Sequence, residues 1–117
     1  DFILMPSKFE PCGLPQMIGS IFGSLPVAFN TGGIHDTVER LNSKNNTGNG
    51  FLFDVYDGPG LEWAINEAIK FYSIPDQVRE QQISRVMKEG RERFNLEETA
   101  KNYFRLYEKM LHRPLVV

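Results

Sequence analysis

A strand, a tight loop and the start of a helix follow one another in residues 2–22, and this succession constrains the fold more than any other feature. Residues 2–5 are a continuous apolar run, Phe-Ile-Leu-Met, which predicts a parallel strand buried on both faces and ended by Pro6. Beyond the loop, apolar residues recur at helical spacing, namely Leu14, Met17, Ile18, Ile21 and Phe22. This pattern predicts a helix whose apolar stripe packs on the strand.

Gly13 and Pro15 punctuate the start of that predicted helix. Glycine lets another group approach the backbone closely, and proline is tolerated in a first turn because the first helical N–H groups lack internal partners. The free N–H groups and the positive end of the helix dipole should therefore point out of the loop. Ligands of open α/β sheets bind outside the carboxyl ends of the strands, so the sequence predicts a loop that attracts phosphate.

A second unit of the same kind follows directly. Gly23 is placed to end the first helix, the apolar run Leu25 to Phe29 predicts a strand, and Thr31-Gly32-Gly33 predicts a loop before a short helix. Two such units in succession imply neighbouring parallel strands. Phe51, Leu52 and Phe53 predict a third short strand. The fold class is therefore α/β, a Rossmann-like parallel sheet with flanking helices.

The rest of the chain is expected to be one polar loop and three helices. Residues 42–50 are polar, contain glycine and show no periodicity, which predicts an exposed loop. Helical spacing resumes at Leu61, a new helix starts at Pro75, and Asn95 is a candidate N-cap for the last helix. We expect a single domain over residues 1–117, with strand-loop-helix units at about 1–24, 25–42 and 50–73 and carboxyl-terminal helices at about 75–112.

Composition narrows the classes of protein that the chain can represent. Its net charge of −2 gives no electrostatic reason to expect nucleic acid or an anionic membrane surface. A single cysteine excludes an internal disulfide framework and suits a reducing compartment, so we expect a cytoplasmic protein. No apolar run approaches the ~20 residues of a membrane-spanning helix. Because Asp1 stands one residue before a predicted buried strand, we also expect the chain to be part of a longer protein.

Two motifs carry a resemblance to a known family. Phe9-Glu10-Pro11-Cys12-Gly13-Leu14, with Gln16 two places on, resembles the donor-site motif of bacterial glycogen synthases and plant starch synthases. Residues 26–38, Pro-Val-Ala-Phe-Asn-Thr-Gly-Gly-Ile-His-Asp-Thr-Val, resemble the strand, T-G-G-L-x-D-T-V loop and helix of the same family. The resemblance continues through Gly50-Phe51-Leu52-Phe53 to the last helix, so it covers essentially the whole chain.

The resemblance implies both a fold and an activity. The chain would be the later half of the carboxyl-terminal domain of a two-Rossmann-domain (GT-B type) glycosyltransferase. The implied reaction transfers glucose, with retention, from ADP-glucose to the non-reducing end of an α-1,4-glucan, without a metal or other cofactor. The implied partners are ADP-glucose or ADP, the α-glucan and the amino-terminal domain of the same protein. The implied location is the cytoplasm, or the plastid in a plant, and this segment alone should be inactive.

The resemblance also implies which residues bind the donor. Glu10 would be catalytic: its carboxylate can accept hydrogen bonds from sugar hydroxyls and favours positive charge at the anomeric carbon. Gly13 and Leu14 would act through their backbone N–H groups, with the Leu14 side chain in the core. Cys12 is either a reactive thiol or a small residue that fits a crowded loop, and we favour fit. The implied substrate-binding residues are Glu10, Cys12, Gly13, Leu14, Thr31, Gly32 and Gly33.

Other interpretations of the sequence remain open. Thr31-Gly32-Gly33 is either a flexible turn or part of the donor pocket, and His35 occupies the variable position of its motif. No pair of histidines or cysteines has metal-ligand spacing. The chain could also be a non-catalytic sugar-nucleotide-binding or regulatory module, a related retaining glycosyltransferase with another donor or acceptor, or a helix-displaying interaction domain. With the neighbours of its first strand absent, we expect the isolated chain to self-associate.

Overall fold

The computed structural model describes residues 1–115, in which three parallel strands form one sheet. The strands are β1 (Phe2–Met5), β2 (Leu25–Phe29) and β3 (Phe51–Phe53), in the order β1-β2-β3. Leu4 lies opposite Val27, and Val27 lies opposite Phe51. The three predicted strands and their parallel pairing are confirmed, and the carboxyl ends of all three therefore lie at one edge of the sheet.

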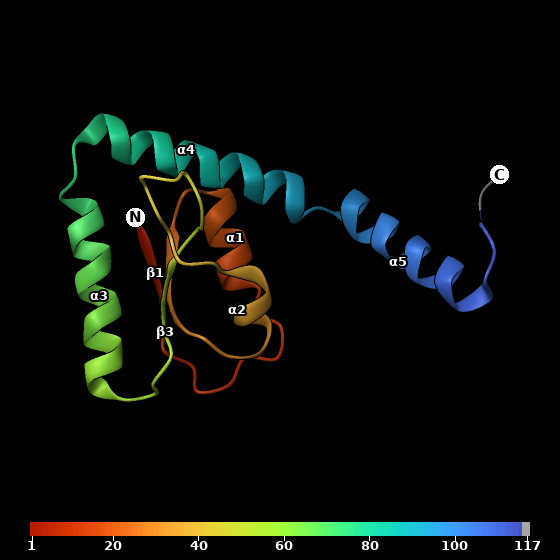
Figure 1. Ribbon diagram of the computed structural model, residues 1–117, viewed down its shortest axis with the longest axis horizontal. Helices are drawn as coiled ribbons and strands as arrows, with labels where there is room; N and C mark the ends of the chain where they lie inside the picture. Colours follow the sequence, from red (N-terminus) through yellow and green to blue (C-terminus); the bar gives the residue numbers. More distant parts are fainter. Residues whose placement is uncertain (116–117) are drawn as a thin grey trace.

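Five helices connect and follow the strands (Figure 1): α1 (Pro15–Ile21), α2 (Gly32–Thr37), α3 (Gly58–Tyr72), α4 (Asp76–Arg93) and α5 (Leu96–Leu111). Their starts follow from the local sequence. Pro15 occupies the first turn of α1, and Asp57 caps α3 by accepting a hydrogen bond from the Gly60 N–H at 2.7 Å. Asn95 caps α5 by accepting one from the Glu98 N–H at 2.8 Å, which confirms the predicted N-cap.

Strand β2 lies at the centre of the sheet and contributes to a core on each face. Leu25 and Val27 pack with Ala64 and Ala68 of α3, together with the phenylalanines of β3. Ala28 faces the opposite way and packs in a second cluster, whose other buried members are Met5, Ile34, Val38 and Leu52. Helix α3 therefore covers one face of the sheet, and α1 and α2 lie along the other (Figure 1).

Strand β1 is an edge strand of the sheet, and the prediction that it is buried on both faces is wrong. Met5 is 6% exposed, whereas Leu4 is 54% exposed. Among residues 1–115, β1 pairs with β2 and with no other strand. An apolar run by itself does not distinguish a central strand from an edge strand.

The predicted apolar stripe of α1 does not face the sheet. Leu14, Ile18 and Phe22 are more than half exposed, and the buried residues of the helix are Gln16, Gly19 and Ser20. The reason is the close approach of α1 to its neighbours. A Cβ on Gly19 would lie 2.9 Å from the Ser24 carbonyl oxygen and 3.2 Å from Ile3 Cγ2. Gly19 and Ser20 therefore occupy the closest contacts, the polar Gln16 is buried with them, and the large apolar side chains point outward.

Residues 42 and 44–47 are exposed, as the sequence predicts for this loop, and two side chains of α4 anchor the loop. Gln82 Nε2 donates to Asn46 Oδ1 at 2.6 Å, and Arg85 Nη2 donates to the Gly48 carbonyl oxygen at 2.7 Å. Gly48 is buried and has a φ of 73°, which favours glycine. Polar composition predicted the loop, but the anchoring side chains come from more than 30 residues away in the sequence.

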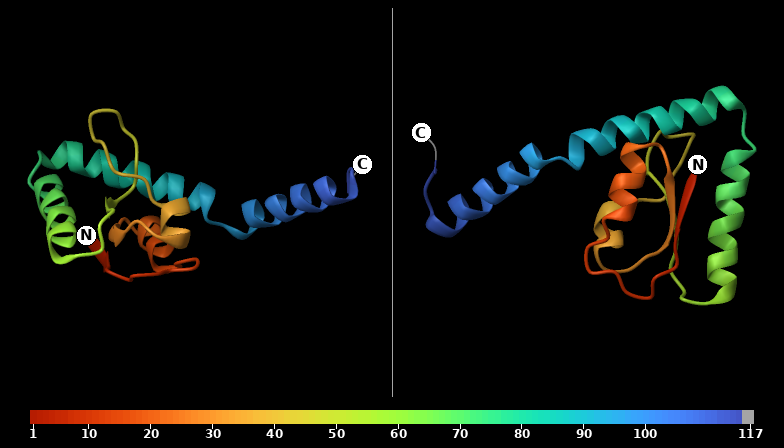
Figure 2. Two further views of the ribbon diagram at one scale, coloured as in Figure 1. Left: turned by 60° about the horizontal axis from the view of Figure 1, so that its bottom comes forward. Right: turned by 180° about the vertical axis from the view of Figure 1, so that it is seen from behind.

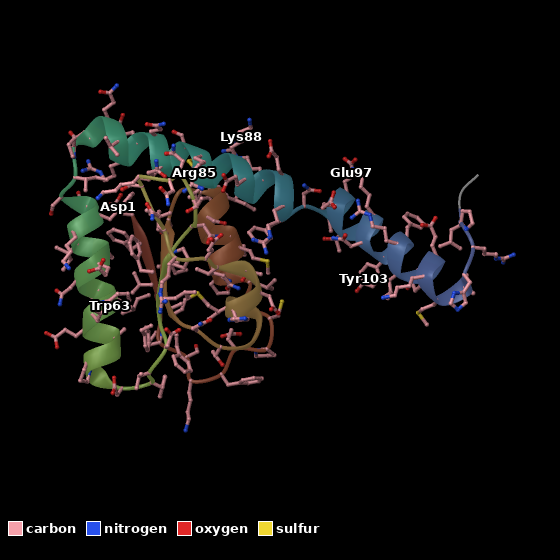
Figure 3. All side chains as sticks on the ribbon, viewed as in Figure 1. Asp1, Trp63, Arg85, Lys88, Glu97 and Tyr103 are labelled. Atoms are coloured by element: carbon pink, nitrogen blue, oxygen red, sulfur yellow. The ribbon has the colours of Figure 1, made fainter. Side chains whose placement is uncertain are left out.

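Helices α4 and α5 differ in how they contact the rest of the molecule. Helix α4 packs on α1, where Gly90 meets Ser20. Helix α5 projects away from the sheet in all three views, and none of its residues is buried (Figures 1 and 2). Side chains such as Glu97 and Tyr103 extend from it into open space (Figure 3). Within residues 1–115 no helix has the length and apolar character needed to cross a membrane.

Candidate functional site

Two loops meet at the carboxyl ends of β1 and β2, where the sequence predicts a ligand site. The Gly33 N–H donates to the Glu10 carbonyl oxygen at 2.9 Å. A Cβ on Gly32 would lie 2.1 Å from that same oxygen, and a Cβ on Gly33 would lie 2.1 Å from the carbonyl oxygen of Cys12. Both positions therefore require glycine. The structure brings the Glu10 loop and the Thr31-Gly32-Gly33 segment into direct contact.

The side chains of Gln16 and Thr37 link the same two segments by hydrogen bonds. Gln16 Nε2 donates to the Cys12 carbonyl oxygen at 3.1 Å and to Thr37 Oγ1 at 3.0 Å. Thr37 Oγ1 in turn donates to the Gly33 carbonyl oxygen at 2.6 Å. Sequence reasoning gave neither side chain a role, although both belong to the two motifs. Their pairing depends on how α1 and α2 are rotated, which sequence spacing does not fix.

The predicted site residues differ in what their side chains contact. The Glu10 side chain is partly exposed, and within residues 1–115 its carboxylate has no hydrogen bond or ion pair with another residue. The Cys12 thiol is free and exposed. Leu14 is 62% exposed as the N-cap of α1, so the prediction that its side chain lies in the core is wrong. Gly13 is buried with a φ of 73°.

Two backbone N–H groups of the loop have no hydrogen-bond partner among the described residues. In the described part of the chain, no acceptor receives a hydrogen bond from the N–H groups of Gly13 and Leu14. Thr31 is the N-cap residue of α2, and its carbonyl oxygen accepts from the N–H groups of Ile34 and His35. Gly32 and Gly33 form the first turn of α2, so the helix begins earlier than the sequence predicts. Unpaired loop N–H groups can bind an anion.

A chain of polar side chains runs beside the site, from α2 to the end of β3. His35 Nδ1 lies 2.8 Å from Asn30 Oδ1, and Asn30 Nδ2 donates to Asp54 Oδ1 at 2.8 Å. The Arg40 guanidinium donates to Asp54 Oδ2 and lies over the Trp63 ring, 5.6 Å from its centroid. The hydrogen bond from Asn30, followed by that from Arg40, lowers the pKa of the Asp54 carboxyl below its ordinary value. These hydrogen bonds orient the His35 ring and stabilise the ionised form of Asp54.

Across residues 1–115, no three or more His, Cys, Asp or Glu side chains are grouped so that they could hold a metal ion. The site that the structure offers therefore consists of backbone N–H groups, one unpaired carboxylate and close-packed glycines.

Glycogen synthases from several bacteria are similar in sequence to this chain. The chain is 39% identical over 115 residues to a glycogen synthase of Trichodesmium erythraeum, covering 97% of this chain and 24% of that protein. It is 40% identical over 113 residues to the glycogen synthase of Petrotoga mobilis and 45% identical over 76 residues to that of Bacillus subtilis. The matches cover 23% and 16% of those two proteins, so the chain spans no more than about a quarter of the length of these relatives. No protein-family model matches the chain.

A solved structure has the same fold as this chain. The catalytic domain of starch synthase IV from Arabidopsis thaliana, bound to ADP and acarbose, superimposes with a TM-score of 0.79 at 31% sequence identity. The match covers 97% of this chain and 23% of that one. The α/β sheet with its flanking helices is therefore the GT-B type of architecture found in that catalytic domain.

Proposed function

The chain belongs to the glycogen and starch synthase family, and from this premise we propose that it forms the donor-binding part of a glucosyltransferase. The proposed reaction transfers glucose from ADP-glucose to the non-reducing end of an α-1,4-glucan, with retention of configuration. Because the chain spans about a quarter of its relatives, the activity is proposed for a whole protein that contains it. The proposed location is the cytoplasm, or the plastid in a plant.

The observation that carries the proposal is the contact of the two loops at the carboxyl ends of β1 and β2. Gly32 and Gly33 let the Glu10 loop approach α2 so closely that any side chain there would collide with it. The unpaired N–H groups of Gly13 and Leu14 lie in the same loop. Negative charge builds on the diphosphate as it leaves the sugar, and fixed donors of this kind stabilise such charge.

Glu10 has the chemistry for the sugar side of the site. Its carboxylate is unpaired within the described residues and can accept charge-assisted hydrogen bonds from hydroxyl groups of glucose. Its negative charge would also favour positive charge developing at the anomeric carbon. We propose Glu10 as the catalytic residue of this segment, with Cys12, Thr31, Gly32 and Gly33 lining the donor pocket beside it.

The ligands of the Arabidopsis structure support this assignment. That protein was bound to ADP and acarbose, so a nucleoside diphosphate is the ligand class that we propose for this chain. Neither a metal nor another cofactor forms part of the proposal. The remaining partners are the α-glucan and the amino-terminal domain of the same protein, and the isolated segment should bind ADP only weakly.

Binding can be tested on the chain itself. Titration with ADP, followed by backbone amide chemical shifts, should perturb Gly13, Leu14 and Gly33 more strongly than residues of α3 and α5. Adenosine without phosphate is the matched control, because the proposed contacts of this segment are with the diphosphate. Shifts confined to residues far from Gly13 and Gly33 would contradict the proposed site.

Transfer activity can be tested in a chimera. The matching quarter of the Trichodesmium glycogen synthase is replaced by this chain, and incorporation of glucose from ADP-glucose into glycogen is measured. The same exchange with the matching segment of the Petrotoga enzyme controls for damage at the junctions. An active Petrotoga chimera beside an inactive one with this chain would refute the enzymatic function. If ADP still bound, the result would favour a non-catalytic sugar-nucleotide-binding module.

A further inference from the structure

We propose that Gln16 is a positioning residue, whose buried side-chain amide sets the distance between the Glu10 loop and the Gly32-Gly33 turn. The structural role is inferred from the hydrogen bonds of Gln16. The effect on catalysis rests on the proposed function. Gln16 lies in the second position of α1 and is 2% exposed. Of the three buried residues of α1, Gln16 has the largest side chain, whereas the apolar side chains of Leu14 and Ile18 are exposed.

The hydrogen bonds around Gln16 close into a ring that includes both loops. The amide of Gln16 donates to Cys12 and to Thr37, the hydroxyl of Thr37 donates to Gly33, and the N–H of Gly33 donates to Glu10. Cys12 and Glu10 are two residues apart in one loop, which completes the ring. The Thr37 hydroxyl is both acceptor and donor, so it passes the orientation of the Gln16 amide on to Gly33.

The orientation of the Gln16 amide follows from its partners. A carbonyl oxygen can only accept a hydrogen bond, so the amide nitrogen must face Cys12. Oε1 is then left buried without a hydrogen-bond partner among the described residues. Both hydrogen bonds that Gln16 donates therefore come from its amide nitrogen. The single amide nitrogen thus connects the Glu10 loop, through Cys12, to α2, through Thr37.

The ring acts on the groups that the proposed reaction uses. A Cβ at Gly13 would lie 2.5 Å from both polar atoms of the Gln16 amide, so the Gly13 backbone rests directly on that amide. Rotation or loss of the amide would shift Gly13 and Cys12 relative to Gly33. Misplacement of a reacting group by about 1 Å can cost about a hundredfold in rate. Gln16 thus acts through Cys12, Gly13 and Gly33 and need not touch the donor.

Hydrogen exchange in the chain itself tests the structural part. In Gln16→Met, which keeps the length of the side chain and removes its polar atoms, the Gly33 N–H should exchange faster than in the wild type. Gln82→Met is the matched control, because Gln82 is also a fully buried glutamine but bonds to Asn46 and Arg85 outside the site. In Gln82→Met, the exchange rate of the Gly33 N–H, divided by the rate expected from global unfolding, should equal the wild-type ratio. Equal protection of Gly33 in Gln16→Met and wild type would overturn the proposal.

Kinetics in the glycogen synthase chimera test the catalytic part. Gln16→Met and Thr37→Val should each lower kcat/KM for ADP-glucose by about ten- to a hundredfold. Thr37→Ser, which keeps the hydroxyl, should recover most of the loss, and Gln82→Met should keep the wild-type value. A loss in Gln82→Met as large as in Gln16→Met, or none in Thr37→Val, would contradict positioning.

The two experiments separate this inference from the proposed function. If the unsubstituted chimera has no activity while the Petrotoga control is active, the proposed function fails, and hydrogen exchange at Gly33 still decides the role of Gln16. If the unsubstituted chimera is active and Gln16→Met is equally active, the positioning role fails and the proposed function stands. Should Gln16→Met not fold, the Thr37→Val and Thr37→Ser pair decides the question.

Discussion

Glu10 presents its backbone and its side chain to different partners. Its carbonyl oxygen accepts a hydrogen bond from Gly33, whereas its carboxylate is unpaired within the described residues. Glu10→Ala keeps the carbonyl group, so the contact between the loops should survive the substitution. In the chimera we expect turnover to fall by about a hundredfold or more, with little change in the thermal unfolding midpoint. Glu62→Ala, an exposed carboxylate on α3, is the control, and near-normal transfer by Glu10→Ala would refute the assignment.

Asp54 makes the stability of the chain depend on pH. Hydrogen bonds from Asn30 and Arg40 lower its pKa from the ordinary value of 3.8, so the folded state favours the ionised carboxyl. Its contribution is complete above that value and is lost as the pH falls through the lowered pKa. The side chains of Arg40 and Asp54 are about half exposed, so we expect their ion pair to contribute less than ~1 kcal/mol to the free energy of unfolding.

The pH dependence of Asp54 is measured by urea unfolding of wild type and Asp54→Asn. The wild type should be the more stable protein at pH 7, and the difference should shrink as the pH falls below 3.8. Glu80→Gln, which removes an exposed carboxylate on α4, serves as the comparison. A difference that persists unchanged at low pH would show that Asp54 acts through shape and not through charge.

Helix α1 depends on small residues for its contacts, which reverses the usual expectation for substitutions. A Cβ on Gly90 would lie 3.0 Å from Ser20 Oγ and 3.3 Å from the Ile21 nitrogen. Gly90→Ala should therefore lower the free energy of unfolding by about 1–3 kcal/mol, although alanine favours helix. Ile18→Ser, on the exposed face, should cost less than ~0.5 kcal/mol. Urea unfolding measures both, and a larger loss in Ile18→Ser would contradict the observed rotation of α1.

Element types were predictable because they rest on local pattern, whereas helix rotation was not. The run Leu25–Phe29 is apolar throughout and forms the central strand, as its composition predicts. For α1, the spacing of apolar residues correctly predicted a helix. Their hydrophobicity predicted that the large side chains face the core, but Leu14, Ile18 and Phe22 are exposed. The close contact with Ile3 and Ser24 admits only small residues there. In the site, strand ends predicted that Glu10 and Gly33 meet, but Gln16 and Thr37, 21 residues apart, pair only through the rotation that the sequence left unspecified.

The whole molecule exposes an edge and an apolar groove. Leu4 of the edge strand is 54% exposed, and Leu14 and Ile18 line a groove with Phe94 and Leu96 at the start of α5. Unpaired strand edges and apolar surfaces favour association, so we expect the isolated chain to form oligomers as its concentration rises. Sedimentation velocity at several concentrations measures this, and Leu4→Lys should shift the distribution toward monomer. A monomer at high concentration would contradict the expectation.

The arrangement of α4 and α5 makes the end of the molecule a lever. Helix α5 has 16 residues and extends about 24 Å at the usual rise of a helix, so a rotation of about 10° at its base would move its far end by about 4 Å. The fulcrum lies at Phe94, between the two helices. Beside it, Arg93 donates to the carbonyl oxygen of Asp36 in α2 at 2.6 Å. Arg93 therefore links the end of α4, next to the start of α5, to the helix that begins with Gly32 and Gly33.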